Sequence, residues 1–422
     1  MNYKKSKYNY FVPYSDGQTI IYNFLSNFTG LLDKDTLDRY NTDTLSEDEQ
    51  KQLYDRGFLI DVNYDELQKI NSDRQRENER DDIKVIRLWT TSACNARCFY
   101  CFEKGLPVET LDEEKCQKVL DYLKPTIKEN DNVIIEWFGG EPLINTKAID
   151  IITKEMIEHC NKVGAKYSAK IISNGSLLNE ELIDKMINDW KIRHIQITLD
   201  GDEKTYNQIK DYKNTSKDNF QSVFNNILLL KDRKNINVAI RLNYTRDNYK
   251  SLITLLNDIG PKLQGSKNII AYVYPIWSTL NKDEEDKFIS DVYSDNNLID
   301  IFDTIIKYGL NKPKKIIRIN YKSFSCRSCN KNSFTILPSG NISKCSESFN
   351  TVYGNIDDGI VNNGYNSWSD FTIDDECTDC IYLPICQGGC EASKHSDMPK
   401  CFAFKPIIDD MLKWYVGKLL QK

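Results

Sequence analysis

Short apolar segments rich in β-branched residues alternate with amphipathic segments from residue 83 onward. The apolar segments cover residues 83–89, 132–138, 168–173, 194–200, 237–244 and 268–276. The segments between them, such as DEEKCQKVLDYLK (112–124) and FQSVFNNILLLKD (220–232), have the apolar spacing of amphipathic helices. Strand–helix alternation predicts parallel βαβ units, and six repeats predict an open, partial TIM-like (β/α)6 barrel. We expect the functional site at the carboxyl ends of its strands.

Residues 1–82 have a different pattern, which predicts a small α+β unit before the barrel at residues 83–319. YFVPYSDGQTIIYNF (10–24) predicts two short strands around a turn. SEDEQKQLYDRGFLI (46–60) opens with a capping box, from Ser46 to Glu49, and predicts a short helix. SDRQRENERDD (72–82) is almost entirely charged or polar, which predicts a solvated linker or an exposed helix end.

Residues 320–422 combine weak helical periodicity with many cysteines. FTILPSGNISKC (334–345) predicts a hairpin, and PIIDDMLKWYVGKLLQK (406–422) predicts a closing amphipathic helix. The segment has little apolar core of its own. Bound metal would explain its stability, because metal binding and folding are coupled.

Composition favours a globular protein and argues against a nucleic-acid-binding or membrane protein. The 422 residues are 40% hydrophobic and 28% charged, as in globular domains, and the net charge of −6 predicts no broad basic surface for nucleic acid. We find neither the apolar core of a signal peptide near the N-terminus nor an apolar run long enough for a membrane helix. We therefore expect a cytoplasmic protein without nucleic-acid or membrane partners, whose thiols are normally reduced.

Thirteen cysteines are many for a reduced chain. Cys116 and Cys160 stand alone in amphipathic patterns and are predicted to be small buried thiols. The other eleven fall into two groups, which indicates metal binding or catalysis. The early group is Cys94, Cys98 and Cys101. The late group is Cys326, Cys329, Cys345, Cys377, Cys380, Cys386, Cys390 and Cys401.

The early cysteines fall in the loop predicted to follow the first barrel strand. Three thiolates are one fewer than a usual structural zinc site needs, and they cannot all pair with one another as disulfides. They can instead hold three irons of a [4Fe–4S] cluster and leave the fourth iron open to another ligand. A partial zinc site or chance thiols are the alternative.

The early group resembles the cluster motif of the radical S-adenosylmethionine (SAM) superfamily, C-x3-C-x2-C with an aromatic residue before the third cysteine. FGGEP (138–142), ISNGSLL (172–178) and QITLDG (196–201) resemble the family's GGEP, TNGT-L-L and Q-I-S-L-D-G segments, each after a predicted strand. The resemblance implies that SAM is a cofactor. The residues that it assigns to the cofactor site are Tyr100, Gly139, Gly140, Glu141, Ser173, Asn174, Thr198 and Asp200.

The resemblance also implies roles for charged residues in this site. Glu141 could pair with the ammonium of SAM, and the preceding glycines could let the backbone approach the ligand. Without the cysteines, this stretch would be an ordinary tight turn with a solvated glutamate. Relatives often carry an arginine for the carboxylate of SAM where this chain has Lys210, and Arg241 is a second cationic candidate. Polar packing at strand ends is the alternative for Thr198 and Arg241.

The late cysteines resemble the SPASM domain, which holds two auxiliary iron–sulfur clusters in that family. They form G-x4-C from Gly340 to Cys345, then C-x2-C-x5-C-x3-C from Cys377 to Cys390, followed by Cys401. The resemblance implies two ligand sets: Cys377, Cys380, Cys386 and Cys401 in one, and Cys326, Cys329, Cys345 and Cys390 in the other. Three [4Fe–4S] clusters are then expected in all. Two four-cysteine zinc sites are the alternative.

Together these resemblances imply an oxidoreductase that modifies a ribosomally made peptide. A 5′-deoxyadenosyl radical would abstract hydrogen, and a thioether or carbon–carbon crosslink would form. The implied partners are a precursor peptide and a low-potential electron donor such as flavodoxin or ferredoxin. Residues 1–82 would bind a leader peptide by strand addition, or only cap the barrel. The alternatives are anaerobic sulfatase maturation to formylglycine and a non-catalytic iron–sulfur or zinc protein.

Overall fold

The computed structural model describes residues 2–421 except 215, 217, 277–296, 325, 349, 371, 395–400 and 403. The chain divides into two compact units. The barrel unit comprises residues 80–312 and 330–368. The terminal unit comprises residues 1–79, 313–329 and 369–422. The domain boundaries expected from the sequence, after residues 82 and 319, stay predictions.

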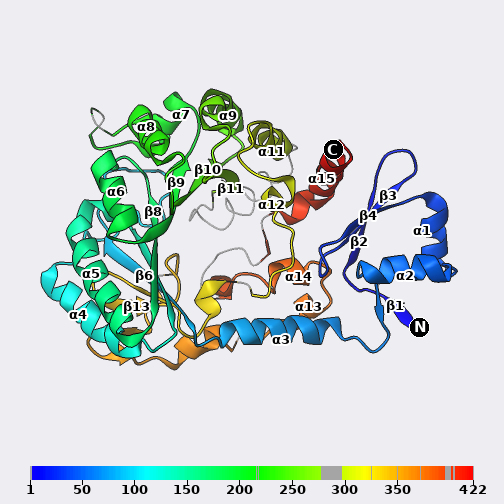
Figure 1. Ribbon diagram of the computed structural model, residues 1–422, viewed down its shortest axis with the longest axis horizontal. Helices are drawn as coiled ribbons and strands as arrows, with labels where there is room; N and C mark the ends of the chain where they lie inside the picture. The colour runs from blue at the N-terminus through cyan, green and yellow to red at the C-terminus, as the bar shows by residue number, and fades with distance from the viewer. Residues whose placement is uncertain are drawn as a thin grey trace. The chain divides into compact units, whose positions relative to one another are not determined.

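Six parallel strands form the main sheet of the barrel unit, in the order β11-β10-β9-β8-β7-β6 (Figure 1). They are β6 (Ile83–Thr91), β7 (Asn132–Gly139), β8 (Lys166–Ser173), β9 (Ile192–Leu199), β10 (Asn237–Tyr244) and β11 (Ile269–Pro275). Each matches one of the predicted apolar segments within a few residues. The predicted α/β class and the partial barrel of six parallel strands are therefore confirmed.

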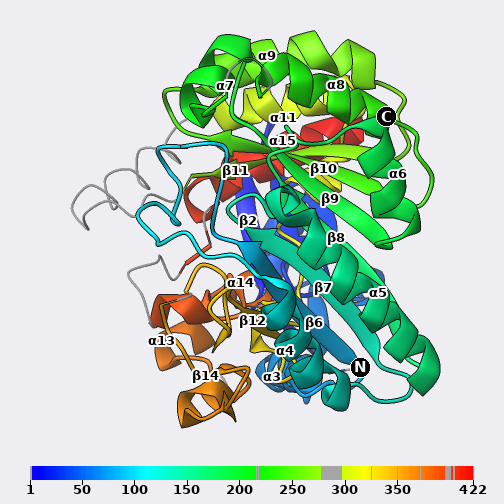
Figure 2. The same cartoon turned by 90° about the vertical axis from the view of Figure 1, so that its left-hand side faces the viewer.

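Helices cover the outer face of this sheet (Figures 1 and 2). They are α4 (Glu113–Leu123), α5 (Thr146–Val163), α6 (Glu180–Asn188), α7 (Glu203–Lys210), α8 (Phe220–Leu230), α9 (Tyr249–Leu263) and α11 (Asn297–Lys307). The lone cysteines Cys116 in α4 and Cys160 in α5 are fully buried, as predicted. In β9, buried Ile195 and Ile197 alternate with partly exposed Gln196 and Thr198, so one face packs under helices while the other stays open.

The same sheet continues with short strands from the cysteine-rich region. β12 (Phe334–Ile336) pairs in parallel with β6 and antiparallel with β13 (Asn341–Ser343). This confirms the hairpin predicted over residues 334–345. The strands β14 (Gly354–Asn355) and β15 (Gly359–Ile360) and the short helix η4 (Asn363–Trp368) complete this part of the unit.

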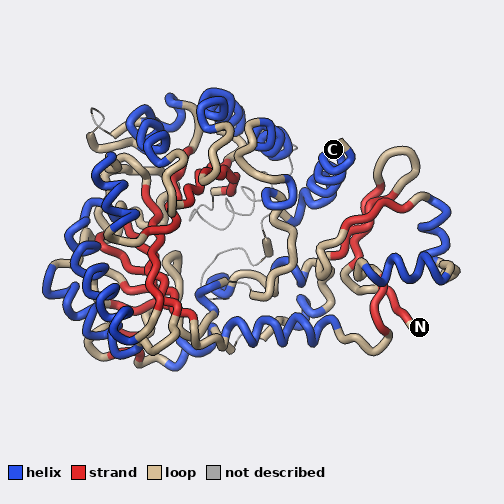
Figure 3. Tube along the Cα trace, viewed as in Figure 1, coloured by secondary structure: helices blue, strands red, loops and turns tan. Residues whose placement is uncertain are grey.

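The N-terminal part of the terminal unit is a small α+β arrangement (Figure 3). One sheet is formed by β2 (Asn9–Pro13), β3 (Thr19–Asn23) and β4 (Thr29–Leu32), and β1 (Tyr3–Lys5) pairs with β5 (Leu59–Asp61). The helices α1 (Lys34–Asn41) and α2 (Glu47–Asp55) follow, and α2 begins with the predicted capping box of Ser46 and Glu49. A shared core holds these elements together: Ile21, Leu32, Tyr40, Leu45, Leu53, Phe58 and Leu59.

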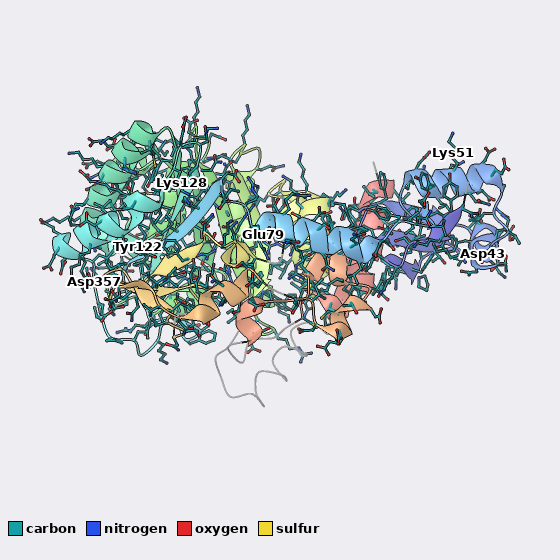
Figure 4. The ribbon with its side chains drawn as sticks, turned by 90° about the horizontal axis from the view of Figure 1, so that it is seen from below. Asp43, Lys51, Glu79, Tyr122, Lys128 and Asp357 are labelled. Atoms are coloured by element: carbon teal, nitrogen blue, oxygen red, sulfur yellow. The ribbon has the colours of Figure 1, made fainter. Side chains whose placement is uncertain are left out.

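Of the two alternatives predicted for residues 72–82, the solvated linker is wrong, because most of this stretch is the C-terminal end of the helix α3 (Glu66–Asn78). The helix end is confirmed, but only one side of it is exposed. Figure 4 shows α3 from below, with Glu79 at its C-terminal end. Asp73 and Arg74 are each only 3% exposed. Asp73 accepts a hydrogen bond from Tyr321 Oη at 2.6 Å. Charged residues can be buried when partners surround them. Asp73 has partners on its own helix, Lys69 and Arg76, and Tyr321 from a distant part of the chain.

Several short helices lie in the rest of the terminal unit, and three of them contain a cysteine: Cys329, Cys377 or Cys386. The short helices are α12 (Pro313–Ile316), η3 (Arg327–Cys329), α13 (Asp375–Thr378), α14 (Leu383–Cys386), η5 (Glu391–Lys394) and η6 (Lys405–Ile407), before the predicted closing helix α15 (Ile408–Leu420). Among the described residues, no helix has the length and apolar character needed to cross a bilayer.

Candidate functional site

The early cysteines follow the carboxyl end of β6 in one tight loop. The Cys101 amide donates to the Cys98 carbonyl at 3.2 Å. All three thiols are partly buried. Burial raises the pKa of the Cys94 thiol to about 12, and the Cys98 and Cys101 thiols add to this shift. Burial likewise raises the pKa of Cys101 to about 11. Without a bound metal, these thiols would stay protonated. A bound metal favours the thiolate form.

The donor set of the loop consists of thiols. Within the described ranges, no group of three or more His, Cys, Asp or Glu side chains is arranged to hold a single ion. Cysteines that bind different irons of one cluster do not have to meet at one point. Cys94, Cys98 and Cys101 act electrostatically on one another and offer three thiols from one loop, as such a cluster requires.

Gly139 and Gly140 bring the end of β7 against the cysteine loop. The Gly140 amide donates to the Thr91 carbonyl at 3.0 Å, and the Glu141 amide donates to the Ala93 carbonyl at 2.9 Å. A Cβ atom added to Gly139 would lie 2.2 Å from the carbonyl oxygen of Thr91. One added to Gly140 would lie 2.4 Å from the carbonyl oxygen of Ala93. The close approach that requires these glycines is therefore made to the end of β6 and to the start of the cysteine loop.

Glu141 connects the carboxyl ends of β7 and β8. Its side chain is fully buried. One oxygen accepts from the Leu143 amide at 3.1 Å and from Ser173 Oγ at 2.9 Å. The other accepts from the Asn174 amide at 2.7 Å. Burial raises the pKa of Glu141 to about 7, although these hydrogen bonds oppose the shift.

Asn174 extends this network to the cysteine loop. Its Nδ2 donates to Asn95 Oδ1 at 2.8 Å and lies 4.0 Å from Cys94 Sγ. Asn95 donates in turn to Ser176 Oγ at 2.8 Å and to Asp218 Oδ2 at 2.9 Å. The first cysteine is thus held by side chains that follow β8.

A second network holds the other end of the loop. Tyr100 Oη donates to Asp200 Oδ1 at 2.9 Å. Lys210 Nζ lies 3.0 Å from Asp200 Oδ2 and 3.1 Å from Tyr100 Oη. Burial alone would lower the pKa of Lys210, but Asp200, with Cys98 and Tyr100, outweighs it and raises that pKa. Lys210 is therefore a protonated cation that is paired with Asp200, and its role toward the carboxylate of SAM stays a prediction.

The end of α7 also binds the backbone of the cysteine loop. The Arg97 amide donates to the Lys210 carbonyl at 2.8 Å. The Lys213 amide donates to the Asn95 carbonyl at 2.8 Å, and Lys213 Nζ donates to the Cys94 carbonyl at 2.8 Å. The loop is thus fixed by residues that follow β7, β8 and β9, three neighbouring strands of the barrel.

Thr198 and Arg241 are opposite each other in the register of β9 and β10. Arg241 Nε donates to Asn243 Oδ1 at 2.9 Å, and its guanidinium lies over the Tyr274 ring, 4.5 Å from the centroid. Tyr272 Oη donates to Gln196 Oε1 at 2.6 Å on the same sheet. These contacts fit polar packing along the strands, and a role for Thr198 or Arg241 toward SAM stays a prediction.

Glu103 is a candidate that sequence reasoning missed. Its Oε2 is buried and accepts no hydrogen bond from the described residues. Burial, and next the charge of Glu141, raise the pKa of Glu103 to about 8. An acceptor buried without a donor is costly, so a ligand cation beside it would be favoured. One feature of the sequence could have identified it: Glu103 is the one acidic residue between Cys94 and Val108.

Three late cysteines of the terminal unit act electrostatically on a fourth, Cys386. The Cys380 amide donates to the Cys377 carbonyl at 3.1 Å, next to α13. Burial raises the pKa of Cys386 to about 11, and Cys380, Cys377 and Cys401 add to the shift. These four residues are the set that the resemblance implies for one auxiliary cluster.

The second implied set is divided between the two units. Cys326, Cys329 and Cys390 lie in the terminal unit, whereas Cys345 follows β13 in the barrel unit. The Cys329 amide donates to the Cys326 carbonyl at 3.1 Å, and Cys329 is fully buried. The joint arrangement of this set stays a prediction.

Two known proteins are similar to this chain in sequence. TigE, a radical SAM cyclopropyl synthase from Paramaledivibacter caminithermalis, is 23% identical over 405 residues, covering 88% of this chain and 82% of TigE. A GTP 3′,8-cyclase from Lactiplantibacillus plantarum is 28% identical over 170 residues, 38% of this chain and 50% of the enzyme.

Solved structures share the fold. Native anSMEcpe with bound AdoMet superposes with a TM-score of 0.58 at 17% identity, over 80% of this chain and 98% of that one. Its complex with AdoMet and the Cp18Cys peptide gives a TM-score of 0.55 at 16% identity, with the same coverage of both chains. The family model described as the Radical SAM superfamily matches residues 90–259, from the end of β6 into α9. This part of the chain, which holds the cysteine loop and both networks around it, is a domain of the radical SAM superfamily.

Proposed function

We propose that the chain is a cytoplasmic radical SAM/SPASM enzyme that modifies a ribosomally made peptide by forming a crosslink. The observation that carries the proposal is the cysteine loop, held at the carboxyl ends of the barrel strands by the Glu141 and Lys210 networks. This loop offers three thiols and no fourth, which suits a cluster with one open iron. The likeness to TigE along most of both chains supports the same class.

The residues of the chain have distinct roles in this proposal. When bound, a [4Fe–4S] cluster with an open iron supplies the electron that cleaves SAM to methionine and the 5′-deoxyadenosyl radical. Cys94, Cys98 and Cys101 hold the cluster, and Asn174 orients the first of these cysteines. Glu103 offers a buried carboxyl oxygen that has no hydrogen-bond partner among the described residues. Burial of these groups excludes water from the site and strengthens their electrostatic interactions.

The proposed bond is a carbon–carbon crosslink in preference to a thioether. TigE is named a cyclopropyl synthase, and closing a three-membered carbon ring joins two carbon atoms. Peptide binding is supported by the fold, since anSMEcpe of the same fold was solved with a peptide bound. The eight late cysteines are proposed to hold two auxiliary clusters, for three [4Fe–4S] clusters in total. The proposed electron donor is a flavodoxin or ferredoxin.

The N-terminal sheet is proposed to bind the leader part of the precursor peptide. Among the described strands, β2 and β4 each have a single partner, β3, so their outer edges offer unpaired backbone groups to an added strand. Precursor peptide with and without its leader, titrated against the full chain, tests this role. Equal affinity of the two peptides would remove it.

The experiment that tests the function uses anaerobically reconstituted enzyme, dithionite, SAM and the peptide encoded beside its gene. We expect 5′-deoxyadenosine and a peptide that has lost two hydrogens, with a new bond located by tandem mass spectrometry. The Cys94/Cys98/Cys101→Ala variant should form neither product. A peptide aldehyde that reacts with hydrazides would indicate formylglycine formation instead. Absence of 5′-deoxyadenosine from a cluster-loaded enzyme would reject both activities.

A further inference from the structure

The helix α3 buries an unusually polar face. Its buried residues are Glu66, Ile70, Asp73, Arg74 and Asn78. Their spacing places them along one side of the helix, where an amphipathic helix normally carries apolar residues. Only Ile70 is apolar in this set, so the surface that covers α3 must supply polar or charged partners.

Most of these partners are identified by direct contacts within the terminal unit. Glu66 accepts from the Lys7 amide at 2.8 Å. Asp73 accepts from Tyr321 Oη at 2.6 Å and pairs with Arg76 at 2.8 Å. Asn78 Nδ2 donates to the Ser369 carbonyl at 3.3 Å. These contacts attach α3 to the two segments that carry the late cysteines of this unit.

Arg74 is the buried cation of this face, and its surroundings are acidic. The groups whose charges act most strongly on it are the Cys329 thiol, the Glu391 carboxyl and the thiols of Cys386 and Cys377. A guanidinium stays protonated in proteins, so Arg74 is a cation that is almost wholly removed from solvent.

These neighbours belong to both of the ligand sets implied by the sequence. Cys377 and Cys386 fall in one set and Cys329 in the other. Thiolates bound to iron carry negative charge, which a buried cation stabilises. The reduced state of a cluster has one more negative charge than the oxidised state, and net charge is one of the factors that set the reduction potential.

We propose that Arg74 is the counter-cation of the auxiliary iron–sulfur site, so that the N-terminal segment forms part of that site in addition to any role in binding peptide. The inference rests on the auxiliary clusters of the proposed function. A guanidinium beside the cysteines favours the reduced cluster and so raises its potential. Arg74 is then a positioning residue for electron transfer, acting through the cluster.

The experiment uses the full chain with Cys94, Cys98 and Cys101 changed to Ala, so that only late cysteines hold iron. Arg74→Met removes the cation, Arg74→Lys keeps it, and Arg76→Met is the matched control. Arg76 is on the same helix, but its side chain is 63% exposed. Iron, sulfide and zinc are measured, and the reduction potential is determined by a redox titration followed by electron paramagnetic resonance.

We expect Arg74→Met to shift the auxiliary potential to more negative values and to lower iron retention. Arg74→Lys should restore most of both, and Arg76→Met should match the parent. A folded, iron-loaded Arg74→Met protein with the parent's potential would overturn the inference. Equal loss of iron in Arg74→Met and Arg74→Lys would also overturn it, because charge would then not be the relevant property. Zinc in place of iron in the parent would overturn the auxiliary clusters of the proposed function, and this inference with them.

Discussion

Lys210 Nζ lies 3.0 Å from Asp200 Oδ2 in an ion pair whose side chains are only 4% and 0% exposed. The pair joins the end of α7 to the end of β9, and Tyr100 joins it to the cysteine loop. Lys210 also influences Cys98, since burial raises the pKa of that thiol and the Lys210 cation opposes the rise. Lys210 is therefore part of the support of the cysteine loop.

Replacing Lys210 with Met should destabilise this support. Removal of one partner of a buried ion pair costs about 3–5 kcal/mol, because the other charge stays buried without compensation. We expect a lower unfolding temperature and loss of iron from the early cluster. The double variant Lys210→Met/Asp200→Asn should recover part of the loss. Arg97→Gln is the control, because its ion pair with Asp211 is more than half exposed and should contribute less than about 1 kcal/mol. Equal effects of Lys210→Met and Arg97→Gln would contradict this assignment.

Glu141→Ala should affect folding as well as SAM binding. The substitution leaves the Leu143 amide, Ser173 Oγ and the Asn174 amide without their acceptor, and a buried unsatisfied group costs about 1–3 kcal/mol. Glu141→Gln keeps an acceptor oxygen and should retain more stability while it loses the charge. Urea unfolding and SAM titration of both variants separate these roles. Unchanged stability of Glu141→Ala would show that its hydrogen bonds are dispensable.

Gly140→Ala should displace the cysteine loop, since the new Cβ would lie 2.4 Å from the Ala93 carbonyl oxygen. Iron at the early cluster, measured by its electron paramagnetic resonance signal, is expected to fall sharply. The control is Gly105→Ala, where the Cβ meets nothing within 4 Å but φ is +89°. That variant should lose only about 1–2 kcal/mol of folding stability, because a residue with a Cβ is strained at positive φ. A full early-cluster signal in Gly140→Ala would argue against the close packing.

Stability should depend on pH through Glu103. Because burial raises its pKa from 4.5 to about 8, the folded protein keeps a proton that the unfolded chain releases in this range. Ionisation therefore costs folding free energy, and stability should fall from pH 5 to 8 by at most about 1.4 kcal/mol per pH unit. Glu103→Gln removes this contribution. Unfolding of both proteins at pH 6 and pH 8 measures it, and identical pH dependence would place Glu103 in a solvated environment.

Iron analysis of the intact protein should give about twelve iron atoms per chain, as three [4Fe–4S] clusters require. The Cys94/Cys98/Cys101→Ala variant should keep about eight. Cys116→Ala is a suitable control, because that thiol is buried in α4 away from the clustered cysteines and should leave the iron content unchanged. About four irons per chain, with zinc, would instead support structural zinc sites at the late cysteines.

The early cysteine motif illustrates what could be predicted from sequence at the site. Its spacing, Tyr100 and the segments around Glu141, Asn174 and Asp200 all follow strands whose apolar pattern is clear. Parallel strands end at one edge of a sheet, so these residues were expected to meet. The networks now observed among Glu141, Ser173 and Asn174, and among Tyr100, Asp200 and Lys210, agree with that expectation.

What the sequence determined by itself is local: the six strands, the capping box at Ser46, the hairpin at residues 334–345 and the cysteine spacing. Periodicity and short-range hydrogen bonds encode these features within a few residues. Tertiary structure alone decided that Lys210 pairs with Asp200, that Gly140 packs against Ala93, and that charged Asp73 and Arg74 are buried. Whether a charge is solvated or buried depends on which distant segment covers it. Tyr321, which binds Asp73, lies 248 residues further along the chain. Cys377, which acts on Arg74, lies further still, and both are beyond the reach of any local pattern.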